Sequence, residues 1–385
     1  MISTRAIGHG LKLAPLGVTK AALQAAAPII SITSQHRGLA TVTVTDTDVD
    51  QARKYCLNQL KHGDYEAYLL RRLVPPSARD AYDALRTLNL ELARLPETVS
   101  TPAIGRFRMQ FWRDTVNSTF AGSPPREPIS ILLRNAITEL TTRAGPGSAT
   151  SLKFWLLRLI NTRDQHMENK PFASLAALED YAENTYATLM YMTLASMPLR
   201  SVHMDHLSSH IGKACGIVAT LRGIPVLAAP SQPVRGPSGA SVGQTRNPAL
   251  LLPLDVMAEA GLREEDVFRI GPDAAGLQDA VFQVATRAND HLITAREMLK
   301  NLRAGESPGH DYEHEGEMEH VYSAAAEGTD NTALDIQRGF GVLLEAVPAA
   351  DYLQRLESAN FDPFKVKGSW KLPWRLWRAT NNHQI

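Results

Sequence analysis

The sequence predicts an all-α fold from residue 48 to the C-terminus, and three observations lead to this class. Apolar residues recur at spacings of three and four through most of the chain. The alternation of apolar and polar residues that marks half-buried strands is almost absent. Helix-start signals are present, because Ser77 and Asp80 form a capping box and Thr101 precedes Pro102 at a first helical position.

The periodic segments give an ordered set of expected helices. We expect them over 51–60, 64–73, 82–97, 105–120, 128–143, 150–162, 175–195, 204–221, 276–302 and 334–356. Two stretches interrupt the pattern: 229–247 is rich in Pro, Gly and Ser, and 303–332 is polar and predicted to be disordered. Helices on both sides of these insertions can share one core, so a single helical domain is expected over 41–385.

The N-terminal 40 residues differ in composition from the rest of the chain. The first 45 residues contain no Asp or Glu but carry Arg5, Lys12, Lys20 and Arg37. Such a segment, rich in Ala, Ser and Thr, is typical of a mitochondrial transit peptide, which we predict over 1–40. A disordered basic tail is the alternative. The 40 basic and 40 acidic residues of the chain cancel, and no nucleic-acid partner is expected.

Other features of the sequence argue against common classes of site. No run of about 18 apolar residues predicts a transmembrane helix. Cys56 and Cys215 belong to no CxxC pair and suit a reduced compartment. His206 and His210 stand four residues apart, but no third ligand is evident, so ordinary polar histidines are favoured. The remaining histidines of note are assigned to a solvated insertion: His310, His314 and His320. Neither a metal nor a cofactor is predicted.

The helix over 82–97 resembles the first aspartate-rich helix of squalene and phytoene synthases. That resemblance implies two facing helices whose aspartates hold Mg²⁺ and the diphosphate of the substrate. In this chain Ala93, Arg94 and Glu97 stand at the first set of carboxylate positions. Gly223 and Leu227 replace the two aspartates of the second set.

Loss of these carboxylates predicts a pseudoenzyme. One remaining carboxylate, that of Glu97, cannot assemble a site for several metal ions. A cation ~4 Å from Arg94 would meet a repulsion of roughly 4 kcal/mol at an effective dielectric constant of ~20. Prenyl transfer of the usual kind is therefore not expected, and no catalytic residue is assigned.

The resemblance extends over 48–360 and implies an isoprenoid-synthase-like helical bundle with a central cavity. The candidate pocket-lining residues are Asn89, Glu97, Gly212, Gly216 and Arg222. The two glycines permit close approach of a helix or of a slender lipid ligand, and helix packing is the favoured interpretation. Arg222 could contact an anion or pair with Glu97.

Four segments of the chain resemble one branch of this superfamily, the mitochondrial complex I assembly factors. They lie at 84–92, 108–112, 181–185 and 203–218. The resemblance implies a matrix protein that is peripheral on the inner membrane. It also implies complex I subunits or assembly intermediates as partners, at an early step that builds the membrane arm or quinone module. The alternative is an isoprenoid- or lipid-binding protein, or a prenyltransferase with an atypical active site.

The C-terminal tail over 368–380 is rich in tryptophan and basic residues. Trp370, Trp374 and Trp377 alternate with cations that include Arg375 and Arg378. Indole rings at the level of the lipid headgroups, with cations on anionic lipid, would make this tail a membrane-interface segment. Folding of the tail back onto the bundle explains the composition equally well.

Overall fold

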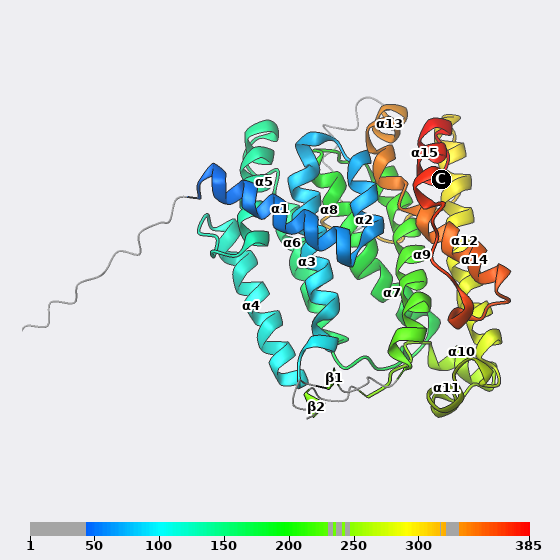
Figure 1. The fold of residues 1–385 in the computed structure, drawn as a ribbon. Coiled ribbons are helices and arrows are strands. Elements are labelled where there is room, and N and C mark those ends of the chain that lie inside the picture. The colour runs from blue at the N-terminus through cyan, green and yellow to red at the C-terminus, as the bar shows by residue number, and fades with distance from the viewer. Residues whose placement is uncertain (1–43, 230–233, 236–240, 243–246, 316, 321–330) are drawn as a thin grey trace, which may run out of the picture. The chain divides into compact units, whose positions relative to one another are not determined.

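The computed structural model describes residues 44–229, 234–235, 241–242, 247–315, 317–320 and 331–385 (Figure 1). The chain divides into two units, Met1–Val42 and Thr43–Ile385, and everything below concerns the second. The predicted transit peptide at 1–40 and most of the loop at 229–247 lie outside the described residues.

The prediction of an all-α fold is confirmed. Two short strands, β1 (Val234–Arg235) and β2 (Ser241–Val242), pair antiparallel within the predicted loop. All the longer elements are helices: α1 Asp46–Gly63, α2 Tyr65–Leu70, α3 Arg79–Thr98, α4 Pro102–Phe120, α5 Pro128–Ala144, α6 Thr150–Gln165, α7 Leu175–Ala182, α8 Thr188–Ser196, α9 Val202–Leu227, α10 Leu254–Glu259, α11 Glu264–Ile270, α12 Leu277–Arg303, α13 Thr332–Leu343, α14 Ala346–Ser358 and α15 Leu372–Asn382.

One of the two predicted helix caps is present. The Thr101 side chain accepts a hydrogen bond from the Ile104 amide, and Pro102 follows at the first position of α4, as predicted. The capping box at Ser77 is wrong: α3 begins at Arg79, after a 3₁₀ turn. The Asp80 carboxylate is instead engaged by Arg53 of α1 at 2.7 Å. Asp80, which the local spacing predicted to be part of a helix cap, therefore forms a long-range ion pair instead.

Two long predicted helices are each divided in the structure. The helix expected over 175–195 contains a π-helical turn, η3 (Glu183–Ala187), between α7 and α8. The helix expected over 334–356 breaks at Leu344 and Glu345, between α13 and α14. Pro348 causes this break, because its ring lacks an amide proton and would clash with the carbonyl four residues earlier.

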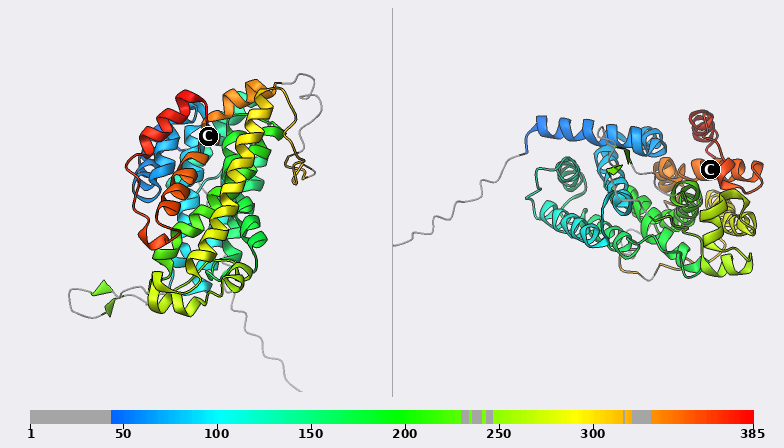
Figure 2. Two further views of the ribbon diagram at one scale, coloured as in Figure 1. Left: turned by 90° about the vertical axis from the view of Figure 1, so that its right-hand side faces the viewer. Right: turned by 60° about the horizontal axis from the view of Figure 1, so that its bottom comes forward.

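Helix α9 lies at the centre of the bundle and is buried almost all round. It packs against α12, α7, η3 and α14, and Figure 2 shows α12 running beside it with α15 on the outer side. A Cβ added at Gly212 would lie 2.3 Å from the Cα of Ala187. One added at Gly216 would lie 2.4 Å from the Ala182 Cβ. Glycine at both positions lets α9 approach the π-turn closely.

Candidate functional site

A central cavity lies between the C-terminal parts of α3 and α9, as the fold class predicts. It consists of two hollows of about 250 and 430 Å³. Both hollows are lined by Ala93, Tyr186, Ala219 and Arg222. Their shared walls place α3 on one side and α9 on the other, the arrangement that holds the metal in the synthases the chain resembles.

Four of the five altered motif positions face this cavity. Ala93 and Glu97 of α3 line it, as do Gly223 and Leu227 of α9. Arg94 does not, because it is exposed and its guanidinium lies over Gly63 of α1. The helical spacing therefore orients the i and i+4 positions inward, and these four positions bring a single carboxylate, that of Glu97, to the cavity.

The candidate pocket residues separate into two groups. Asn89, Glu97, Gly216 and Arg222 line the cavity. Gly212 does not; it packs against the backbone of η3, so its lack of a side chain serves helix packing alone.

Other carboxylates at the cavity wall are already bound within the protein. Glu66 pairs with Arg222 at 2.8 Å, so Arg222 binds this acid and not Glu97. Glu345 pairs with Arg86, and both side chains are buried. Breaking the buried Arg86–Glu345 pair would leave an uncompensated charge, so the Glu345 carboxylate is poorly available to an external cation.

Sequence reasoning missed Arg163, a buried cation at the wall of the larger hollow. The residue is 8% exposed, and its Nη2 donates to Asn89 Oδ1 at 2.8 Å. Its Nη1 donates to the Tyr181 hydroxyl. Among the described residues, no carboxylate pairs with it, and its Nε has no hydrogen-bond partner. The sequence did carry a signal for its burial, because Arg163 continues the spacing of three and four that places Leu152, Leu156 and Leu159 on the buried face of α6.

A second polar region forms where the chain after α12 packs against α9. The prediction of disorder over 303–332 is wrong for the described residues up to 320. His320 is fully buried and its Nδ1 lies 2.8 Å from Asp205 of α9. The buried Tyr312 hydroxyl lies 2.9 Å from that of Tyr191. Polar composition suggested disorder, but these side chains find buried partners.

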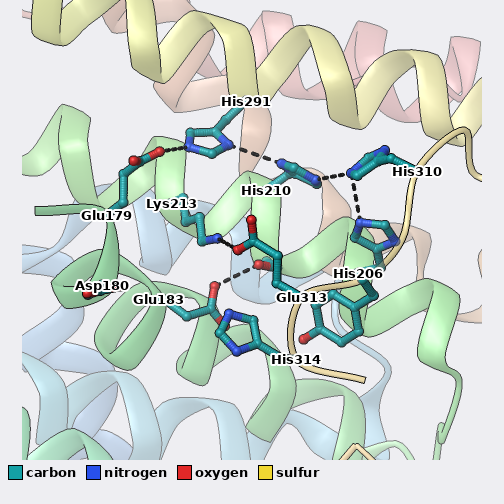
Figure 3. A network of polar contacts seen from close by, with 12 residues as sticks. Glu179, Asp180, Glu183, His206, His210, Lys213, His291, His310, Glu313 and His314 are labelled. Carbon is teal, nitrogen blue, oxygen red and sulfur yellow. Dashed lines mark hydrogen bonds and ion pairs between the residues drawn. The ribbon is translucent and has the colours of Figure 1, made fainter. Parts of the chain in front are cut away.

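This packing brings together histidines that are distant in sequence (Figure 3). The Nε2 atom of His310 lies 2.9 Å from Nε2 of His206 and 2.8 Å from Nε2 of His210. On its other side, His210 Nδ1 lies 3.0 Å from Nδ1 of His291, whose Nε2 contacts Glu179 at 2.6 Å. The i, i+4 pair was visible in the sequence, but its partner from residue 310 was not.

Burial keeps the two α9 imidazoles neutral. Burial and the neighbouring His310 lower the pKa of His206 to about 4. Burial and the neighbouring His291 lower the pKa of His210 to about 2. Desolvation disfavours the charged form of a histidine, so both rings are uncharged at neutral pH.

The tail folds back onto the bundle and leaves its indole rings exposed. Leu372 and Leu376 of α15 are buried against the bundle, so the segment does fold back. Its indoles remain outside: Trp370, Trp374 and Trp377 are 84%, 56% and 62% exposed. Arg375 pairs with Asp351 of α14 at 3.0 Å, and the Arg378 guanidinium lies over the Trp374 ring. In the part of the chain that the structure describes, every helix is too short or too polar to cross a membrane.

Comparison with known proteins gives consistent results. The family model described as squalene/phytoene synthase matches residues 60–309. A rat protein named NADH dehydrogenase (ubiquinone) complex I, assembly factor 6 is 32% identical, over 82% of this chain and 77% of its own length. The human protein of that name is 29% identical over 93% and 92%. A Dictyostelium discoideum homologue of it is 22% identical over 89% and 80%.

A solved structure shows the same fold. The crystal structure of a dehydrosqualene synthase in complex with ligand matches with a TM-score of 0.58 and 11% identity. The match covers 88% of this chain and 98% of that one.

Proposed function

Because the chain belongs to the squalene/phytoene synthase family, and within it to the group of complex I assembly factor 6, we propose that it assists the assembly of mitochondrial complex I. The observation that carries this proposal is the similarity to relatives of that name over most of the chain. The protein acts without catalysis, as a scaffold that retains the synthase fold.

The lining of the cavity supports a non-catalytic role. The inward-facing motif positions bring one carboxylate, that of Glu97, to the cavity. A cluster of Mg²⁺ ions that binds a diphosphate needs several oxygen ligands. Glu66 and Glu345 are held by arginines, and Arg163 adds a buried positive charge. The lining thus holds these two acids in pairs with arginines and adds an arginine without a carboxylate partner among the described residues, an arrangement unlike a cluster of metal-binding carboxylates.

The proposed location is the mitochondrial matrix, peripheral on the inner membrane. The acid-free segment at 1–40 supports import, and the exposed indoles and cations of the tail support contact with an anionic membrane surface. The partners are complex I subunits or assembly intermediates, at an early step that builds the membrane arm or quinone module.

Loss of the gene tests the assembly role. We expect a null mutant to lose assembled complex I on native gels while its sterol and carotenoid levels stay unchanged, and the wild-type gene to restore the complex. A normal complex I profile in the null mutant would contradict the proposal. Measurable condensation of farnesyl or geranylgeranyl diphosphate by the purified protein with Mg²⁺ would contradict the pseudoenzyme.

Membrane contact is tested by changing the exposed indoles. Trp370, Trp374 and Trp377 replaced together by Ala should weaken flotation with vesicles that contain anionic lipid. A matched control replaces three exposed aromatic residues elsewhere: Phe107, Phe111 and Phe154, which are 77%, 48% and 42% exposed. Equal loss of flotation in both triple variants would argue against a specific role for the tail.

Lipid binding is a second candidate function, and Arg163 is the observation that favours it. A buried guanidinium without a carboxylate partner, in the wall of a hollow of about 430 Å³, suits the acidic group of a lipid. Mass spectrometry of the protein isolated from mitochondria should then detect an acidic lipid that is lost in Arg163→Met. Lipid retained equally by Arg163→Met, or absent from the wild type, would contradict this candidate.

A further inference from the structure

The three histidines on and over α9 form a compact group of ligand atoms outside the central cavity. One ring nitrogen from each of His206, His210 and His310 lies within 4.8 Å of the other two. His206 is buried, His210 half-buried and His310 exposed, so the group is open to solvent on one side. The same Nε2 atom of His310 makes both short contacts described above (Figure 3).

Hydrogen bonds alone cannot satisfy this arrangement. A neutral imidazole nitrogen carries either one proton or one lone pair, never both. If His310 Nε2 carries a proton, it can direct that proton at only one of its two neighbours. If it carries a lone pair, it can accept only one well-directed hydrogen bond. In either state, one of the two contacts at 2.8 and 2.9 Å is left without a proper hydrogen bond.

A chain of contacts behind His210 sets its tautomer. The Glu179 carboxylate can only accept at neutral pH, so Nε2 of His291 donates to it. When the His291 ring is neutral, its Nδ1 carries a lone pair and accepts the proton on Nδ1 of His210. This leaves the lone pair of His210 on Nε2, aimed at the group. A carboxylate behind a histidine is the usual outer-shell support of a metal ligand.

We propose that His206, His210 and His310 bind a divalent transition-metal ion of the zinc type through their Nε2 atoms, with water at the fourth position. Three imidazoles suit Zn²⁺, and a site with three protein ligands and one open position is a known type. Zn–N bonds of ~2.0–2.1 Å at tetrahedral angles separate the nitrogens by ~3.3 Å. Binding therefore requires the exposed His310 ring to move outward by about half an ångström, and the His206 and His210 nitrogens, which lie within 4.8 Å of each other, to take up the same ~3.3 Å spacing through small rotations of their rings.

The surrounding charges permit a cation at this place. Lys213 lies on the same face of α9, but its ammonium group is paired with Glu313 at 3.1 Å. Glu179 supplies negative charge behind His291, although Arg287 also binds that carboxylate.

Such an ion fastens the segment at 304–320 to α9. His310 reaches the site from that segment, whereas His206 and His210 are fixed one turn apart on the central helix. The inference does not depend on the role in complex I assembly, because it follows from the positions of the rings alone.

The test measures zinc binding by the tag-free full-length chain. Competition with a chromogenic chelator should show one Zn²⁺ per chain, and Co²⁺ in its place should give the visible absorption of a tetrahedral site. His310→Ala should weaken binding by more than the ~10–100-fold typical of losing an outer-shell partner. His206→Gln should do the same. His62→Ala, which removes an exposed histidine of α1, should leave binding unchanged.

A second measurement follows the docked segment itself. Residues 304–337 contain no Lys or Arg, so a glutamate-specific protease is used, and Glu315 is exposed. Zn²⁺ should slow cleavage in the wild type but not in His310→Ala. The proposal fails if the wild type binds no zinc, if His310→Ala and His206→Gln bind it as well as His62→Ala does, or if Zn²⁺ leaves cleavage unchanged.

Discussion

The two halves of α9 face different kinds of polar environment. The C-terminal half, from Gly216 to Leu227, borders the central cavity and brings no carboxylate of its own to it. The N-terminal half carries His206 and His210, which meet a histidine that arrives from a distant segment. The C-terminal half thus lines a cavity with small and apolar side chains and one arginine, whereas the N-terminal half brings imidazole nitrogens to a polar cluster outside that cavity.

The difference shows that one helix can serve two polar regions of different chemistry. On the cavity side, carboxylates are held by arginines within the protein. On the histidine side, three ring nitrogens converge and the partly buried Glu179 carboxylate lies behind them. A metal would therefore bind at the N-terminal half of α9, although the family resemblance directs attention to the C-terminal half.

The largest effect is expected from breaking a buried ion pair at the cavity wall. Arg86→Met leaves the Glu345 carboxylate buried without a counter-charge, which should cost ~3–5 kcal/mol of unfolding free energy. Arg222→Gln breaks a pair whose arginine side chain is 40% exposed and should cost less than ~1 kcal/mol. Urea unfolding measures both. Similar losses of unfolding free energy in the two variants would show that burial does not determine the contribution of these ion pairs.

A second pair of variants tests whether the glycines of α9 serve packing or the cavity. Gly212→Ala forces a methyl group against the backbone of Ala187 and should cost about 3 kcal/mol. Gly223→Ala meets only the flexible Leu227 side chain at 3.3 Å and should change stability by less than ~1 kcal/mol, towards stabilisation. Thermal unfolding distinguishes them, and a reversed order would contradict the packing role of Gly212.

The histidines at the N-terminal half of α9 predict that a bound metal ion stabilises the folded protein. A ligand at 100 times its dissociation constant stabilises the folded state by ~2.7 kcal/mol. Zn²⁺ should therefore raise the unfolding free energy of the wild type by about that amount, and a chelator should remove the gain. In His310→Ala the gain should be absent. A gain of equal size in that variant would place the ion elsewhere.

The smallest effect concerns a buried carboxylate on α3 outside both regions. Burial raises the pKa of Asp83 to about 6, although Arg71 binds it at 2.7 Å. The folded state then takes up a proton between pH 7 and pH 5 that the unfolded state does not. Relative to Asp83→Asn, the wild type should gain about 1.4 kcal/mol at pH 5 over pH 7. Parallel pH profiles of the two proteins would contradict this assignment.

Helical periodicity explains why much of the fold and part of the cavity could be predicted. A spacing of four fixes which side chains share a helix face, so Asn89, Ala93 and Glu97 could be placed together from the sequence. Partners across the bundle could not. Arg222 binds Glu66, which lies 156 residues earlier, and His310 meets His210 across 100 residues. Such contacts depend on how helices pack, and no local pattern encodes them.

The π-helical turn η3 has a consequence for comparing this protein with its relatives. A π-turn contains one more residue than an α-turn, so the extra residue is taken up within the turn and α7 and α8 keep the facing of one continuous helix. Glu183 and Tyr191 stand eight residues apart and are hydrogen-bonded across this turn, and deleting one residue between them would leave the seven-residue spacing that an α-helix places on one face. A relative that lacks the extra residue would align with a one-residue gap inside an unbroken helix. An alignment that omits this gap would shift every later pair of equivalent residues by one position.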